Sequence, residues 1–182
     1  LYLLAINVNT RYLFAELLNN KLDNNNYSNT NLRTNSSILQ AIHKMQEKGL
    51  DAKYLSGDGE KAFLQFNRNE LGNIKWIPVR RILMGNYPYY MKKQHNKPIY
   101  DPMHNSLGII DRVIRTLRDM AYNIKVNVIT PDIMDELVEQ YNNAPHRILS
   151  EYAGYSVSPK QVQEDPNLES FIVRRICQSN YN

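Results

Sequence analysis

The start of the chain constrains the fold most, because it contains two apolar runs separated by a short polar break. The first run includes Leu3, Leu4 and Ile6, and the second spans residues 12–15. A continuous apolar strand of this kind is usually central in a sheet and covered on both faces. The polar break at residues 9–11 is short enough for a tight hairpin. The sequence therefore predicts two paired strands in a sheet that other elements must cover.

The rest of the chain alternates between helical and extended patterns. Apolar residues at helical spacing and capping residues predict the helices, and short apolar runs predict the strands. The expected order is a polar loop over 19–34, a helix starting near Ser36 or Ser37 and ending before Gly49, a strand over 51–55, a helix over 60–71, a strand over 74–79, an extended loop over about 80–103, a helix over 106–122, a helix from Thr130-Pro131 to about Asn143, and a short helix after Ser158-Pro159. This order predicts an α/β fold with one mixed central sheet flanked by helices.

Composition is ordinary for a soluble globular chain, with 42% hydrophobic and 22% charged residues. No apolar run approaches the ~20 residues that a membrane span needs, so we expect no membrane partner. Cys177 is the single cysteine, which excludes an internal disulfide, and an intracellular compartment is the default expectation. The net charge of +4 suits a polyanionic partner such as DNA without requiring one.

Three polar positions fall where a metal site could be built. Asn7 ends the first strand, Asp58 follows another strand, and Asp111 lies on the first turns of the strongest helix. Enzymes that cut and join phosphodiester bonds hold two divalent metals ~4 Å apart with carboxylates. Strand ends and a helix face are rigid platforms for such a cluster, and Mg²⁺ or Mn²⁺ prefers oxygen ligands.

Four stretches, in order along the chain, carry a family resemblance. They are Ile6-Asn7-Val8-Asn9-Thr10-Arg11-Tyr12, Ser56-Gly57-Asp58-Gly59-Glu60-Lys61-Ala62-Phe63, the helix from His104 to Leu117, and Tyr141-Asn142-Asn143-Ala144-Pro145-His146-Arg147 followed by Ser158-Pro159. Together they resemble the catalytic core of retroviral-type integrases, which retroelements and large self-synthesising DNA transposons and their virus relatives also carry.

The resemblance implies an RNase H-like core over residues 1–150, with 151–182 as a C-terminal extension of that core. It implies DNA 3′-end processing by a metal-activated water, followed by strand transfer in which the freed hydroxyl attacks target DNA. Carried over to this sequence, the family's catalytic positions are Asn7, Asp58 and Asp111, with Asp58 and Asp111 as ligands of Mg²⁺ or Mn²⁺. It also implies DNA as a partner, a homodimer or larger assembly, and association with the nucleus or a virion.

This sequence departs from the family pattern at two of the three positions. Asn7 is a neutral amide in place of a carboxylate, and Asp111 is one methylene shorter than the family's Glu. We therefore expect catalysis to be weak or absent. Asn7 is either an introduced substitution or a natural change; Ala62 and Ile114, where the family favours Glu or a polar residue, favour natural degeneration.

The basic residues follow the same resemblance. In an integrase, Arg112, Arg115 and Arg118 would meet DNA phosphates along the helix, and Lys92 and Lys93 of the long loop would add contacts. Each feature also has a plainer interpretation: the arginines as a solvated face, Asp58 as a turn residue, Asp111 as a solvated carboxylate and Asn7 as a satisfied core amide. His104 and His146 lack a second ligand at zinc spacing, so zinc is not expected.

The alternative function belongs to another class. It is a domesticated, non-catalytic integrase fold that serves as a structural or DNA-binding subunit of a larger assembly. A nuclease of the same fold fits less well, because the segment from Tyr141 to Arg147 is integrase-like. Loss of the acids with retention of the basic surface would favour DNA binding, and loss of both would favour a structural role.

Overall fold

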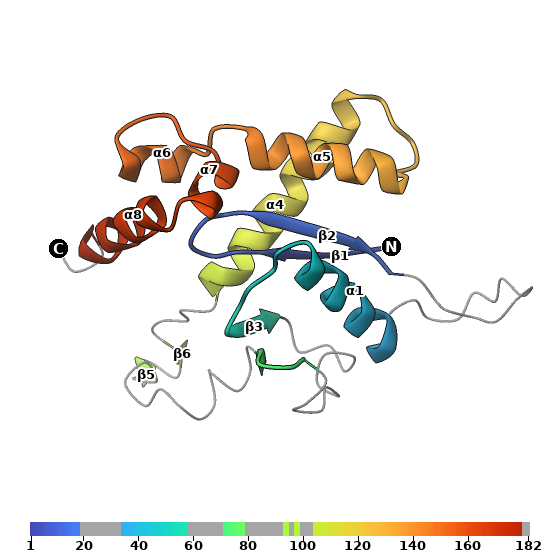
Figure 1. Cartoon of the computed structure of the whole chain (residues 1–182), viewed down its shortest axis with the longest axis horizontal. Coiled ribbons are helices and arrows are strands. Elements are labelled where there is room, and N and C mark those ends of the chain that lie inside the picture. The colour runs from blue at the N-terminus through green and yellow to red at the C-terminus, as the bar shows by residue number, and fades with distance from the viewer. Residues whose placement is uncertain (19–33, 58–70, 79–92, 95–96, 99–103, 180–182) are drawn as a thin grey trace, which may run out of the picture. The chain divides into compact units, whose positions relative to one another are not determined.

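The structure, a computed structural model, describes residues 1–18, 34–57, 71–78, 93–94, 97–98 and 104–179. These residues form an α/β chain, as the sequence predicts (Figure 1). The elements, in order, are β1 (Tyr2–Ile6), β2 (Leu13–Leu17), α1 (Asn35–Glu47), β3 (Tyr54–Gly57), β4 (Lys75–Pro78), β5 (Lys93–Gln94), β6 (Lys97–Pro98), α4 (His104–Asn123), α5 (Pro131–Asn143), α6 (Arg147–Ala153), α7 (Pro159–Glu164) and α8 (Pro166–Ser179).

The chain divides into two compact units. One comprises Leu1–Leu3 with Glu16–Ile109, and the other comprises Leu4–Ala15 with Ile110–Asn182. The domain boundary expected at residue 150 is not tested by this division and stays a prediction.

The predicted hairpin is confirmed. β1 and β2 pair in a two-stranded sheet, and the backbone N–H of Asn7 donates to the Tyr12 carbonyl oxygen at 2.9 Å where the strands meet the turn. β2 is the more buried strand, because its residues 13–16 are all buried whereas β1 is half-buried throughout.

In the first unit, α1 packs its apolar face into a small core. Ile38, Ala41 and Ile42 pack with Leu71 and Ile74. The helix starts slightly earlier than Ser36 or Ser37, because the Thr34 hydroxyl accepts the backbone N–H of Ser37 and caps it. Its end agrees with the sequence, since Gly49 has a φ of +96° just beyond the last turn.

The expected single mixed sheet is not present among the described residues. They form three separate two-stranded sheets, in which β3 pairs with β4 in parallel and β5 pairs with β6 antiparallel. β3 starts three residues later than the expected strand over 51–55. β4 falls within the expected strand over 74–79. The helix expected over 60–71 and most of the expected loop over 80–103 lie outside the described residues.

The long helices of the second unit agree with the sequence. α4 contains the expected helix over 106–122, and α5 starts at Pro131 with Thr130 as its cap. The Thr130 hydroxyl accepts the backbone N–H of Ile133, which satisfies one of the free donors of the first turn. None of the helices in the described part of the chain is long and apolar enough to cross a membrane.

Three further helices, α6, α7 and α8, follow α5 in the second unit (Figure 1). Contacts join α6 to α8, α7 to α8, and α5 to α7. Their shared core contains Leu149, Val157, Val162 and Ile172, all at most 1% exposed. Burying each of these side chains contributes about 1.5–3 kcal/mol. The expected helix after Ser158-Pro159 is confirmed as α7, whereas α6 and α8 were not predicted.

Candidate nucleic-acid interface

The turn of the β1–β2 hairpin is built around the side chain of Asn7. Its amide oxygen accepts the backbone N–H of Asn9 at 2.9 Å and of Thr10 at 3.3 Å. Its backbone oxygen accepts the N–H of Arg11 at 2.8 Å. Asparagine favours such turns because its short amide can replace a backbone acceptor. Asn7 therefore fixes the conformation of the turn.

Gln163 of α7 fastens this turn to the C-terminal helices. Its Oε1 accepts the Asn7 Nδ2–H at 3.1 Å and the Thr10 hydroxyl at 2.7 Å. Thr10 is 1% exposed, so this hydrogen bond is shielded from water. At the rim of the same turn, Asn9 Nδ2 donates to Glu169 of α8 at 3.1 Å. The turn is thus held by side chains from two helices of the second unit.

This network bears on the predicted metal ligands. The amide of Asn7 is engaged on both its oxygen and its nitrogen. Asp111 is exposed on α4 and makes no hydrogen bond or ion pair with another described residue. Asp58 lies outside the described residues. Within the described ranges, no three His, Cys, Asp or Glu side chains gather as a metal ion would require. Of the three predicted positions, the two that are described, Asn7 and Asp111, together supply one carboxylate.

The predicted DNA-binding arginines are exposed on α4. Arg112, Arg115 and Arg118 follow one another at three-residue spacing, which spreads them over one side of the helix. None of them forms an ion pair with a described residue. Lys92 lies outside the described residues, and only the backbone of Lys93, in β5, is described.

A second group of residues, mostly basic, interacts near the hairpin turn; of its members, only Arg112 was predicted from the sequence as a site residue. Arg11 adopts a left-handed φ of 61°, and its Nη1 is buried without a hydrogen-bond partner among the described residues. Arg11 interacts electrostatically with Tyr141 of α5 and Arg112 of α4. His146, which caps α6, interacts with Arg11, Arg112 and Arg147. We call these five residues the Arg11 cluster.

The electrostatics of the Arg11 cluster follow from burial and like charge. Burial lowers the pKa of His146, and the three arginines lower it further. Burial raises the pKa of Tyr141, an effect that Arg11 opposes. Burial likewise lowers the pKa of Arg11, Tyr141 raises it and Arg112 lowers it. At neutral pH the cluster therefore holds three guanidinium charges with a neutral histidine and a neutral tyrosine.

Asn142, within the integrase-like segment, has a structural role. Its Oδ1 accepts the Leu13 backbone N–H at 2.8 Å, and its Nδ2 donates to the Leu13 carbonyl oxygen at 2.9 Å. Asn142 is 3% exposed and Leu13 is fully buried. The side chain thus pairs with β2 as a neighbouring strand would, and joins α5 to the hairpin.

Three of these positions were missed as functional or structural residues from sequence alone. Gln163 gives no signal, because an isolated glutamine on a short helix is usually solvated. Asn142 was noted only as part of a motif, although an asparagine next to the buried stripe of α5 suggests a partnered amide. Arg11 was noted in the polar break and in the first of the four integrase-like stretches, but not as a site residue, because its partners at residues 141–147 are distant in the sequence.

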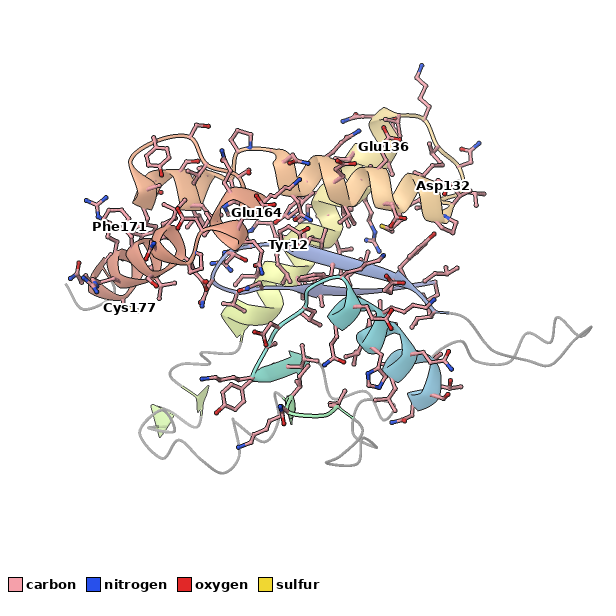
Figure 2. The ribbon with its side chains drawn as sticks, viewed as in Figure 1. Tyr12, Asp132, Glu136, Glu164, Phe171 and Cys177 are labelled. Atoms are coloured by element: carbon pink, nitrogen blue, oxygen red, sulfur yellow. The ribbon has the colours of Figure 1, made fainter. Side chains whose placement is uncertain are left out.

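Two acidic residues of α5, Asp132 and Glu136, lie toward the end of the helix that is away from Tyr141. Figure 2 shows Asp132 and Glu136 on α5, in the half of the helix that begins at Pro131, and Tyr141 comes near the opposite end. At 1.5 Å per residue, Asp132 and Tyr141 are separated by about 13 Å along the helix axis. Glu164 ends α7 (Figure 2).

Comparisons were made with protein-family models, curated proteins and solved structures, and none of them matches this chain.

Proposed function

We propose that this chain is an integrase-type core with an RNase H-like fold that binds DNA and performs strand transfer weakly or not at all. The observation that carries the proposal is the engagement of Asn7. Both ends of its amide are used in the hairpin turn and in the hydrogen bond to Gln163. The position at which the family would place a carboxylate ligand is here a structural turn residue.

DNA binding is supported by the basic side chains that remain. Arg112, Arg115 and Arg118 are exposed and form no ion pair with a described residue. Neutralising DNA phosphates releases condensed counterions, so log affinity falls with log salt with a slope of about −0.9 per contacted phosphate. If all three arginines contact phosphates, they contribute about −2.7 to that slope.

The Asn7 network also favours the second candidate, a non-catalytic integrase fold used as a DNA-binding or structural subunit of a larger assembly. In this candidate the side chain at position 7 stabilises the turn and has no catalytic role. A homodimer or a larger assembly of this chain, and residence with DNA in the nucleus or in a virion, are compatible with both candidates.

The test compares the natural chain with Asn7→Asp. An aspartate keeps the oxygen that accepts the N–H groups of Asn9 and Thr10, and Gln163 can turn its amide so that its nitrogen faces the new carboxylate. One control is Asn9→Asp, which adds the same charge two residues away but also loses the hydrogen bond to Glu169. The matched control is therefore Asn167→Asp, which adds the charge at an exposed position outside the turn. Calorimetry measures Mn²⁺ and Mg²⁺ binding, and a labelled duplex reports end processing.

We expect the natural chain to bind duplex DNA in a salt-dependent way without processing it. Tighter Mn²⁺ binding and end processing by Asn7→Asp, but by neither control, would support an integrase core that is disabled at one ligand. DNA binding without metal binding by Asn7→Asp would support the non-catalytic candidate. Absence of DNA binding by the natural chain would refute the DNA-binding function. A DNA affinity that does not change when all three arginines of α4 are replaced with glutamine would refute their role in it.

A further inference from the structure

Arg11 is placed where a charged side chain needs an anionic partner. Its backbone is fixed by the hairpin, since its N–H donates to Asn7 O at 2.8 Å and its φ is 61°. The side chain is half-buried, and Nη1 is fully buried with no hydrogen-bond partner among the described residues. Buried donors in proteins are nearly always paired, and an unpaired charged donor is the costliest exception.

The neighbours of Arg11 add positive charge instead of cancelling it. Arg112 approaches from α4, and His146 and Arg147 come from the start of α6. Arg112 and Arg147 are themselves exposed. The one carboxylate adjacent to these residues in sequence is Asp111, which is exposed and unpaired among the described residues. Arg112 repels Arg11, and both of them, together with Arg147, interact with His146. An anion bound among these groups would offset the repulsion.

The two neutral members of the cluster can donate hydrogen bonds. Burial raises the pKa of Tyr141, so its hydroxyl keeps its proton at neutral pH. The Nδ1 of His146 accepts the backbone N–H of Leu149 at 3.5 Å as the cap of α6. The proton of the neutral imidazole is therefore on Nε2, which leaves Nε2 as a donor.

We propose that the Arg11 cluster binds a phosphate group, with Arg11, Arg112 and Arg147 supplying charge and Tyr141 and His146 supplying neutral donors. The planar guanidinium group suits phosphate because it presents paired N–H donors to two oxygens. The same chemistry suits a phosphodiester of DNA and free phosphate. Binding to a DNA phosphate depends on the proposed function, whereas binding to phosphate itself does not.

The experiment measures binding of inorganic phosphate and of a short DNA duplex to the whole chain by calorimetry at constant ionic strength. The variants are Arg11→Gln and Arg147→Gln, with Arg174→Gln as the matched control. Arg147 and Arg174 are both exposed, so their replacement removes the same charge with little effect on folding. Arg174 lies on α8 and interacts with none of the residues of the Arg11 cluster in the structure.

We expect Arg11→Gln and Arg147→Gln to weaken phosphate binding about 10- to 100-fold each, and Arg174→Gln to leave it unchanged. The proposal is overturned if the natural chain does not bind phosphate, or if Arg147→Gln binds it as tightly as Arg174→Gln does. Phosphate binding that responds to the variants while DNA binding is absent would keep the phosphate site and refute the DNA-binding function. DNA binding that weakens equally in all three variants would mean diffuse attraction, which would refute the site.

Discussion

Replacing Asn142 with alanine should be the most damaging single polar substitution in the second unit. The asparagine side chain makes two hydrogen bonds to the backbone of Leu13, at 2.8 and 2.9 Å, and water has no access to the pair. Alanine removes both partners and leaves the buried N–H and C=O of Leu13 unpaired.

The expected magnitude follows from these two groups. Each buried backbone group that loses its partner costs about 1–3 kcal/mol, so the free energy of unfolding should fall by about 2–6 kcal/mol. Folded proteins are typically stable by only about 5–15 kcal/mol, so a loss of this size would unfold a large part of the population under mild conditions. With a urea m-value of about 2 kcal/mol/M, the midpoint of urea unfolding should move down by about 1–3 M.

The neighbouring Asn143→Ala is the matched control. Asn143 also donates from Nδ2 to a backbone oxygen, that of Glu139 at 2.9 Å, but the hydrogen bond is exposed. Water can replace this partner, so the midpoint should move by less than about 0.5 M. Circular dichroism at 222 nm, a standard helix signal, follows the urea unfolding of both variants. Equal shifts of the two midpoints would refute the view that the Asn142–Leu13 pair stabilises the fold.

Two further predictions concern stability. Ser158→Ala should lower the free energy of unfolding by about 0.5–2 kcal/mol, because Ser158 and Gln161 exchange two hydrogen bonds as a capping box at α7; an unchanged urea midpoint would contradict this. Burial and the surrounding arginines lower the pKa of His146 below its usual 6.5, so on acidification the imidazole is protonated in the unfolded chain before it is in the folded one. The contribution of His146 to stability is therefore present above about pH 6.5 and is lost as the pH falls. His146→Asn keeps a capping side chain without the titration, so its stability should fall less steeply on acidification, by up to about 1.4 kcal/mol per pH unit; identical slopes would count against the lowered pKa of His146.

The helices were the most predictable part of the fold, because their signals are local. Thr130-Pro131 and Ser158-Pro159 each place a capping hydroxyl before a proline, and both start helices in the structure. The same signal is present at Asp165-Pro166, where the Asp165 carboxylate accepts the N–H groups of Asn167 and Leu168 and starts α8. The Asp165-Pro166 pair is therefore a local sequence signal for the start of α8.

The sheet arrangement and the candidate site were less predictable, because they depend on contacts between distant segments. The hairpin was correctly predicted from a polar break, but the turn conformation depends on Gln163, which is 156 positions from Asn7. The Arg11 cluster likewise joins the hairpin to α4, α5 and α6. The hydrogen-bond partner of a polar residue can be predicted from a sequence pattern only when the two residues are close in the sequence. The partners of Asn7 and Arg11 are far from them in the sequence.

The attachment of the hairpin turn to α7 has a consequence for the order of folding. Asn7, Asn9 and Thr10 find their side-chain partners 153 to 160 positions later in the chain. During synthesis, the turn leaves the ribosome long before Gln163 and Glu169 exist. Contacts across such long stretches form late and slow the overall reaction. The hairpin turn is therefore completed late, although it is translated before its partners. A nascent chain interrupted before α7 would carry a turn without these hydrogen bonds.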